Sequence, residues 1–163
     1  MSKATKAGTV LATAAVALAV AGAGNTIIPK KTIPFVGTYT GNATVQVSDQ
    51  VADISASGKG TGTLIGSSSI SGKGTGDASQ QPCAPFTGPG TMVGTGGKIA
   101  FTVVSGSQGC GDEQGQVFSL SGKANVTSAT GKLAKAKGVL RFTGVYDRGA
   151  GTFSVKFKGT LTQ

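Results

Sequence analysis

The sequence contains no histidine and no tryptophan, and it has only six acidic residues against fifteen lysines and arginines. Without histidine, neither a Ser-His-Asp nor a Cys-His catalytic arrangement can form, and the commonest transition-metal ligand is missing. No serine stands three residues before a lysine, and no Gly-x-x-x-x-Gly-Lys-Ser/Thr phosphate loop occurs. The sequence therefore predicts no metal and no cofactor, and it favours binding over catalysis.

Long apolar segments are also missing, apart from one at the start of the chain. Lys3 and Lys6 precede an uncharged run from Ala7 to Gly24, which is typical of a secretory signal peptide. Small residues favour cleavage after Ala21 or Ala23, and we prefer Ala23. The alternative is a membrane anchor, but the run is mostly Ala and Gly and lies at the short edge of the roughly 20 residues that a span needs.

The rest of the chain is expected to be one exported domain. No cysteine lies in the first 82 residues and no arginine pair precedes the apolar run, so we expect the general secretory route and a secreted, extracellular product. We assign residues 1–23 to the signal peptide, 24–34 to an N-terminal extension and 35–163 to the folded domain. Loss of Lys3 and Lys6 leaves a net charge of +7.

Only two cysteines are present, Cys83 and Cys110. An exported protein folds where thiols oxidise, so a structural disulfide is the expected state. A thiol or metal site is the alternative, but two thiolates cannot complete the four ligands of a structural zinc.

Short apolar stretches separated by Gly, Ser and Thr run through the whole domain. In Phe153–Lys158 large apolar residues alternate with Ser and Lys, as expected for a strand with one buried face. Leu133–Val139 contains helix formers, but flanking glycines allow at most one or two turns. The pattern predicts an all-β domain.

A glycine-rich repeat favours a barrel over a sandwich. Ser57–Gly62 recurs as Ser71–Gly76, and the offset fits neighbouring strands of one sheet. In each copy three glycines share one strand face, which allows sharp coiling or leaves room for a bulky neighbour or a ligand. Closing the sheet also removes exposed edges, so we predict a single antiparallel barrel of about eight strands.

Two groups of charged residues are candidates for binding or chemistry. Asp53 and Asp147 are the carboxylates that could lie inside a barrel and act as a base. Six basic residues fall within the last two or three predicted strands, and if those strands pair they form a basic stripe. The stripe could bind an anionic polymer, or could simply keep an outward face soluble. Its members are Lys132, Lys135, Lys137, Arg141, Lys156 and Lys158.

The segment Ala129–Gly138 resembles the Gly-Gly-Thr-Gly-Lys-Phe-x-x-Ala-Arg-Gly segment of the dirigent and allene oxide cyclase type of barrel. Thr130, Gly131 and Lys132 match, as do Leu133, Ala136, Lys137 and Gly138, whereas Ala129 replaces the preferred glycine. The resemblance implies an eight-stranded barrel with a hydrophobic cavity open at one end. No residue matches the family's catalytic positions, so no catalytic role is carried over.

Together these features favour non-catalytic binding of a small hydrophobic ligand, or a structural role outside the cell. Four phenylalanines at alternating positions would line an apolar pocket: Phe101, Phe142, Phe153 and Phe157. The alternatives are a dirigent-like or cyclase-like enzyme that guides a small hydrophobic substrate, and polyanion binding by the basic stripe. Specific nucleic-acid recognition is not expected, because no tryptophan supports base stacking. Nor is membrane association expected after cleavage.

Overall fold

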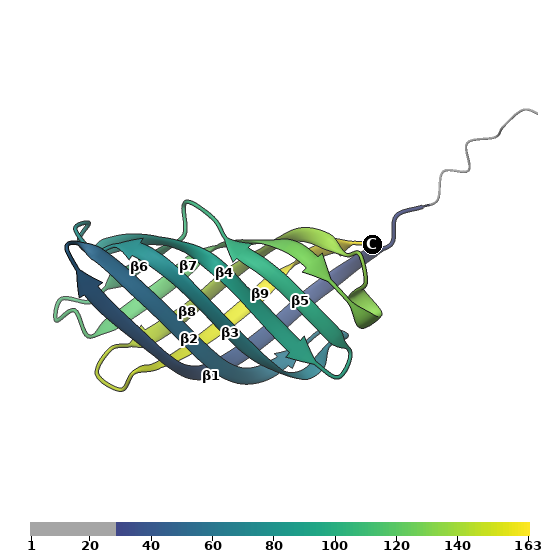
Figure 1. The fold of residues 1–163 in the computed structure, drawn as a ribbon, viewed down its shortest axis with the longest axis horizontal. Coiled ribbons are helices and arrows are strands. Elements are labelled where there is room, and N and C mark those ends of the chain that lie inside the picture. The colour runs from purple at the N-terminus through teal and green to yellow at the C-terminus, as the bar shows by residue number, and fades with distance from the viewer. Residues whose placement is uncertain (1–28) are drawn as a thin grey trace, which may run out of the picture.

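The computed structural model describes residues 29–163 (Figure 1). The predicted signal peptide and its cleavage sites lie outside these residues. The first strand begins at Thr32, slightly before the predicted domain boundary at residue 35.

Nine antiparallel strands close into a barrel with eight strand positions (Figure 1). The strands are β1 (Thr32–Ser48), β2 (Val51–Gly62), β3 (Gly66–Asp77), β4 (Cys83–Gly94), β5 (Gly97–Val103), β6 (Gln108–Gly111), β7 (Val117–Ala129), β8 (Lys137–Asp147) and β9 (Thr152–Thr162). The short β5 and β6 both pair with β4 and β7, so together they act as one interrupted strand. Pairing of β1 with β9 and of β3 with β4 completes the ring. The prediction of a closed barrel of about eight strands is confirmed.

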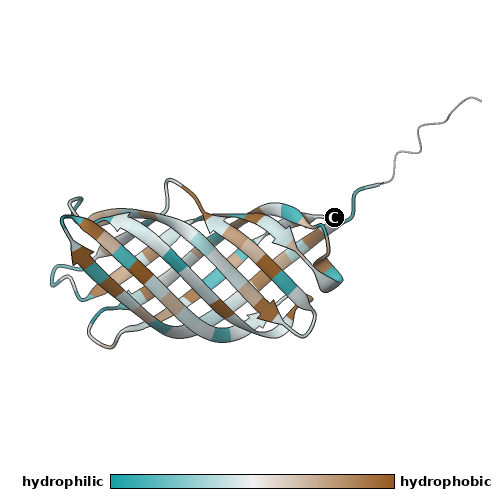
Figure 2. Ribbon diagram, in the orientation of Figure 1, coloured by the Kyte–Doolittle hydropathy of each residue, from teal (hydrophilic) through white to brown (hydrophobic). Residues whose placement is uncertain are grey.

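The strands alternate between a buried and an exposed face, as the sequence predicts. On β9, Val155, Phe157 and Leu161 are buried, whereas Lys156 and Lys158 are exposed. Figure 2 shows the same alternation as hydrophobic and hydrophilic bands along the strands. The buried side of every strand faces the barrel interior, which is the only core of the described chain.

Glycine at two facing positions lets the barrel curl tightly. Gly41 of β1 lies opposite Gly58 of β2. A Cβ atom built on Gly41 would lie 2.1 Å from the carbonyl oxygen of Ser57, and one built on Gly58 would lie 2.3 Å from that of Thr40. Because the obstructing atoms are backbone, no side chain fits between these strands. The repeated segments occupy β2 and β3, which pair with each other as predicted.

One end of the barrel is plugged by the connection between β7 and β8. This connection contains a single 3₁₀ turn, η1 (Gly131–Leu133), within the limit of one or two turns that the sequence sets. Leu133 and Ala136 are fully buried there, in the same cluster as Met92 and Ile99. Gly131 has a φ of +65°, and a Cβ atom on it would meet the Gly96 carbonyl oxygen at 2.2 Å. This end of the barrel is therefore packed solid.

A buried tyrosine makes a side-chain hydrogen bond inside the barrel. The Tyr39 hydroxyl lies 3.0 Å from Ser68 Oγ, which in turn donates to the carbonyl oxygen of Gly66. In this contact either hydroxyl group can be the donor. Burial raises the pKa of Tyr39, and the Ser68 contact offsets part of that rise.

Replacing Tyr39 by phenylalanine should lower the free energy of unfolding by about 1 kcal/mol near neutral pH, the usual net value of one hydrogen bond. It should also weaken the alkaline loss of stability. In the native protein, the stability that comes from the neutral Tyr39 hydroxyl is fully present below about pH 10, the pKa of an unfolded tyrosine. This contribution is lost as the pH rises through the higher pKa of the folded state. Urea unfolding of both proteins at about pH 8 and about pH 11 would measure both effects. An identical alkaline loss in both proteins would contradict this account.

Candidate functional site

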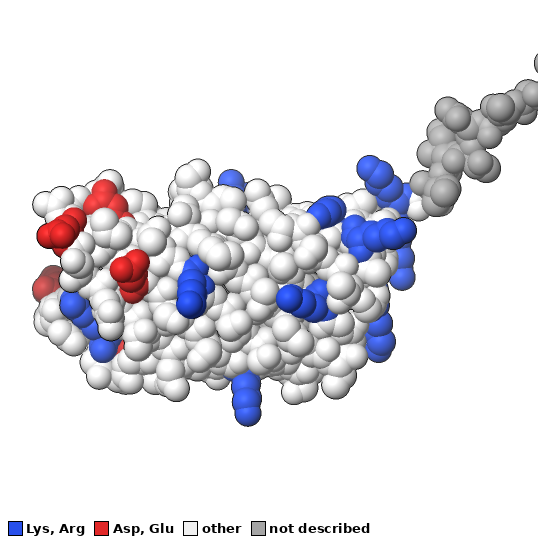
Figure 3. Space-filling model, viewed as in Figure 1, with Lys and Arg blue, Asp and Glu red and all other residues white. Residues whose placement is uncertain are grey.

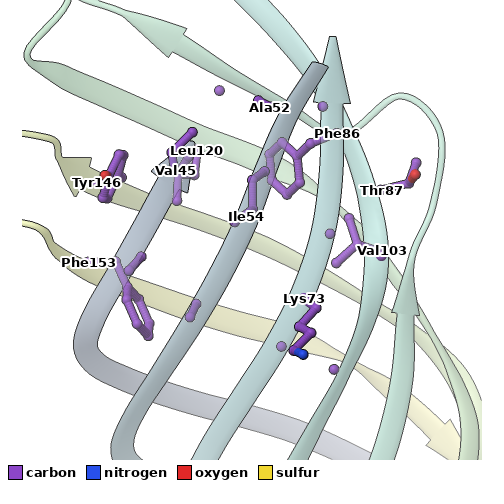
Figure 4. A pocket seen from close by; sticks show the side chains of 18 of the residues that line it. Val45, Ala52, Ile54, Lys73, Phe86, Thr87, Val103, Leu120, Tyr146 and Phe153 are labelled. Carbon is purple, nitrogen blue, oxygen red and sulfur yellow. The ribbon is translucent and has the colours of Figure 1, made fainter. Parts of the chain in front are cut away.

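The other half of the barrel contains a cavity of about 270 Å³. It opens between the connections that join β1 to β2, β3 to β4, β6 to β7 and β8 to β9, at the end opposite the η1 plug (Figure 1). Figure 4 shows Val45, Ile54, Phe86, Leu120 and Phe153 around it. Its walls are overwhelmingly apolar. We call the open end of the barrel the mouth.

One wall of the cavity is hollow because four neighbouring strands carry small residues at the same level. Strand register places Ala43 of β1 beside Ala56 of β2, Gly72 of β3 and Gly90 of β4. All four belong to the cavity lining. Toward the mouth, β3 continues with glycine at its next two inward positions. Ala43, Ala56 and Gly72 leave space on this wall, whereas the ring of Phe101 packs over Gly90. At Gly74 and Gly76 the absence of a side chain instead lets β3 lie close to the backbone of β4.

The floor of the cavity begins one inward position farther from the mouth. There, register brings together Ile70 of β3, Met92 of β4 and Ile99 of β5. These three side chains are almost completely buried and fill the barrel cross-section. The change from glycine to large aliphatic residues therefore marks where the cavity ends and the packed core begins.

Aromatic rings form another part of the wall, on β5, β8 and β9. The ring centroids of Phe101 and Phe157 are 5.6 Å apart, and those of Phe142 and Phe157 are 5.7 Å apart. Phe153 lies closer to the mouth, near Tyr146 (Figure 4). The structure thus places all four phenylalanines named from the sequence in the cavity lining.

The structure places neither candidate carboxylate in the cavity. Asp53 is exposed on the outside of β2, because Ala52 and Ile54 on either side of it point inward. Asp147 follows the inward Tyr146 and turns its Oδ1 to accept a hydrogen bond from the backbone N–H of Ala150. Among the described residues that line the cavity there is no acidic side chain. The arrangement provides no carboxylate base for chemistry inside the barrel.

All six acidic residues of the protein lie at or near the mouth. They are Asp49, Asp53, Asp77, Asp112, Glu113 and Asp147. Figure 3 shows acidic side chains gathered at this end, with basic ones mainly elsewhere. Hydrogen bonds from Ser79 and Gln80 lower the pKa of Asp77, and Asp112 accepts one from the backbone of Gln116. Several of these carboxylates therefore shape the turns around the opening.

The six residues of the predicted basic stripe lie in two separate parts of the structure. Arg141 on β8 and Lys158 on β9 lie directly opposite each other, with Lys156 two residues from Lys158. Lys132 and Lys135 instead lie in the plug connection. Lys137 starts β8, and its ammonium group donates to the carbonyl oxygen of Thr127.

Sequence reasoning missed Lys123, which lies on β7 directly opposite Arg141. The turn between β8 and β9 is short enough that pairing Arg141 with Lys158 could have been read from the sequence. The pairing of Lys123 with Arg141 could not be predicted in this way, because the connection between β7 and β8 has no regular turn pattern.

The predicted disulfide is confirmed. Cys83 of β4 and Cys110 of β6 are paired residues on neighbouring strands and are joined by an S–S bond of 2.05 Å. The bridge fixes the short β6 next to β4 near the mouth. It is compatible with an oxidising, extracellular location.

Residues Ala129–Gly138, which carry the family resemblance, build the plug and the start of β8. They lie at the end of the barrel away from the mouth and belong to its packed core. No known protein family, no curated protein and no solved structure matches this chain. Within residues 29–163, no helix is long and apolar enough to cross a membrane.

Proposed function

We propose that this protein binds a small, uncharged, apolar molecule in the cavity at the mouth of its barrel. The observation that carries the proposal is the apolar cavity of about 270 Å³ with an open end. A cavity of roughly 150 Å³ lined by aliphatic and aromatic side chains holds a benzene ring. The present cavity is therefore suited to a two-ring aromatic compound or a short alkyl chain.

Its lining supports binding rather than chemistry. The walls combine aliphatic side chains with the phenylalanine cluster. Among the polar residues of the lining, Tyr146 and Arg148 lie toward the mouth, and Lys73 lies on β3 as an exposed residue (Figure 4). Apolar pockets with few polar anchors are typical of ligand carriage. With the proposed secretory signal, the role would be capture or transport of such a molecule outside the cell.

An enzyme-like role is the second candidate. A barrel with an apolar cavity open at one end is the architecture that the dirigent and allene oxide cyclase resemblance implies. Such a protein would guide a reactive intermediate by the shape of its cavity. Against this candidate, the described lining offers no acidic group and the resembling segment lies away from the cavity.

Filling the cavity tests the proposal. We expect replacement of Ala56 by phenylalanine to weaken binding of 1-aminonaphthalene, an uncharged two-ring fluorescent probe, by at least about tenfold, because the new ring would occupy the small-residue wall. Titration of the probe, followed by its fluorescence increase, measures the dissociation constant.

The matched control is the same replacement at Ser55, the preceding residue, which is exposed on the outer face of β2. Its affinity should equal that of the native protein, and urea unfolding should show that both variants are folded. If the two variants bind the probe equally well, or if the native protein does not bind it at all, the proposed function is wrong.

A further inference from the structure

The outer surface of β7, β8 and β9 carries a row of three cations created by strand register. Lys123 of β7 lies opposite Arg141 of β8, and Arg141 lies opposite Lys158 of β9. All three side chains are exposed. Neighbouring strands are about 4.8 Å apart, so the row is a short linear array of positive charge. We call these three residues the cationic row.

The row has a cost in stability. Like charges directly opposite each other on neighbouring strands destabilise a sheet. A single lysine would keep this face soluble with less repulsion between neighbouring positive charges. Lys156, on the same face of β9, adds a further positive charge beside the row.

The acidic residues at the mouth do not neutralise the row. Asp147, the acid on β8, lies about 20 Å along the strand from Arg141 at about 3.3 Å per residue. The Debye length at physiological ionic strength is about 8 Å, so this carboxylate is largely screened from the row. The row therefore presents its positive charge to an external partner.

The chemistry of the surrounding surface indicates which partner fits. All nine aromatic residues of the protein occupy inward positions or line the interior. The outer face consequently has no ring to stack on a nucleic-acid base, and no large aromatic anchor for a lipid surface. Beside exposed valines such as Val36 and Val139, this face offers a line of charges at regular spacing.

We propose that the cationic row binds a linear polyanion bearing repeated sulfate or phosphate groups. The acidic mouth would be repelled from the same polymer, so the barrel would bind along its β7–β9 face with the cavity left open to solvent. This binding site is separate from the cavity and does not depend on the proposed ligand-binding function.

The test compares two variants that lose the same charge. In the first, Lys123, Arg141 and Lys158 are each replaced by glutamine. In the control, Lys98, Lys132 and Lys135 are replaced by glutamine, which removes three exposed cations from the plugged end. Heparin and long-chain inorganic polyphosphate are the probes, with affinities measured at several salt concentrations.

We expect the row variant to lose at least about tenfold in affinity for one or both polymers, and to show a shallower dependence on salt. The control variant should lose less than about threefold. The polymer with the larger loss distinguishes sulfate from phosphate groups. Equal losses in the two variants would show a general effect of net charge and overturn the proposal. Tighter binding to phosphatidylglycerol vesicles than to either polymer would overturn it in favour of a membrane.

Discussion

Replacing Gly41 by alanine is expected to lower the free energy of unfolding by about 3 kcal/mol or more, a large fraction of the roughly 5–15 kcal/mol that stabilises a typical domain. The new Cβ atom would lie 2.1 Å from the carbonyl oxygen of Ser57 and 2.4 Å from the Cα atom of Gly58. Both atoms are backbone in a paired strand, so relief requires β1 and β2 to separate. Their separation would break the pairing on either side of the contact.

The control is the same replacement at Gly72, which also faces the interior. A Cβ atom there meets only the carbonyl oxygen of Pro89, at 3.3 Å, and the Cα atom of Gly90, at 3.7 Å. We expect this variant to lose less than about 1 kcal/mol. Urea unfolding followed by circular dichroism measures both values. Equal stability of the two variants would mean that close approach of β1 and β2 does not limit the barrel.

Removing the disulfide should produce the other large effect. The bridge joins residues separated by 27 positions, and constraint of the unfolded chain by a loop of this length contributes about 3 to 4 kcal/mol. Replacing Cys83 and Cys110 together by alanine should therefore lower the free energy of unfolding by about 3 kcal/mol. Urea unfolding of the double variant measures this loss.

The native protein treated with a reducing agent is the control and should match the variant. Local structure should change mainly at β6, which has only four residues and pairs with just three residues of β4. Amide hydrogen exchange would show this as faster exchange in Gln108–Gly111 than in β8. An unchanged unfolding midpoint in the variant would show that the pairing of β4 with β6 does not need the bridge.

Much of the architecture could be predicted because it depends on local patterns. The alternation in Phe153–Lys158 sets the inner and outer faces of β9. Because the chain has only two cysteines, only one disulfide was possible. The paired glycine repeats indicated a strongly curved sheet. The same period of two could have placed Asp53 outside, since Ile54 beside it is the apolar residue that points inward.

The cavity could not be predicted, because it depends on register across four strands. Ala43, Ala56, Gly72 and Gly90 are far apart in the sequence and meet only if three successive turns have the right lengths. A slip of one residue in any pair would point its side chains to the other face. The cationic row also depends on strand register, and for this reason the sequence did not reveal Lys123. For the same reason Lys132 and Lys135 were assigned to strands, although they lie in the connection between β7 and β8.

Pairing of β1 with β9 has a consequence for how the chain reaches its native state. Thr32–Asn42 pair with Thr152–Thr162, so closing the barrel requires contacts between the two ends of the domain. Such long-range pairing carries the largest loop-closure entropy and folds slowly, commonly in milliseconds to seconds. Until β9 is in place, β1 and β8 are open strand edges that can pair with other chains. The risk of aggregation is therefore concentrated in the interval before closure, and refolding yield should fall as protein concentration rises.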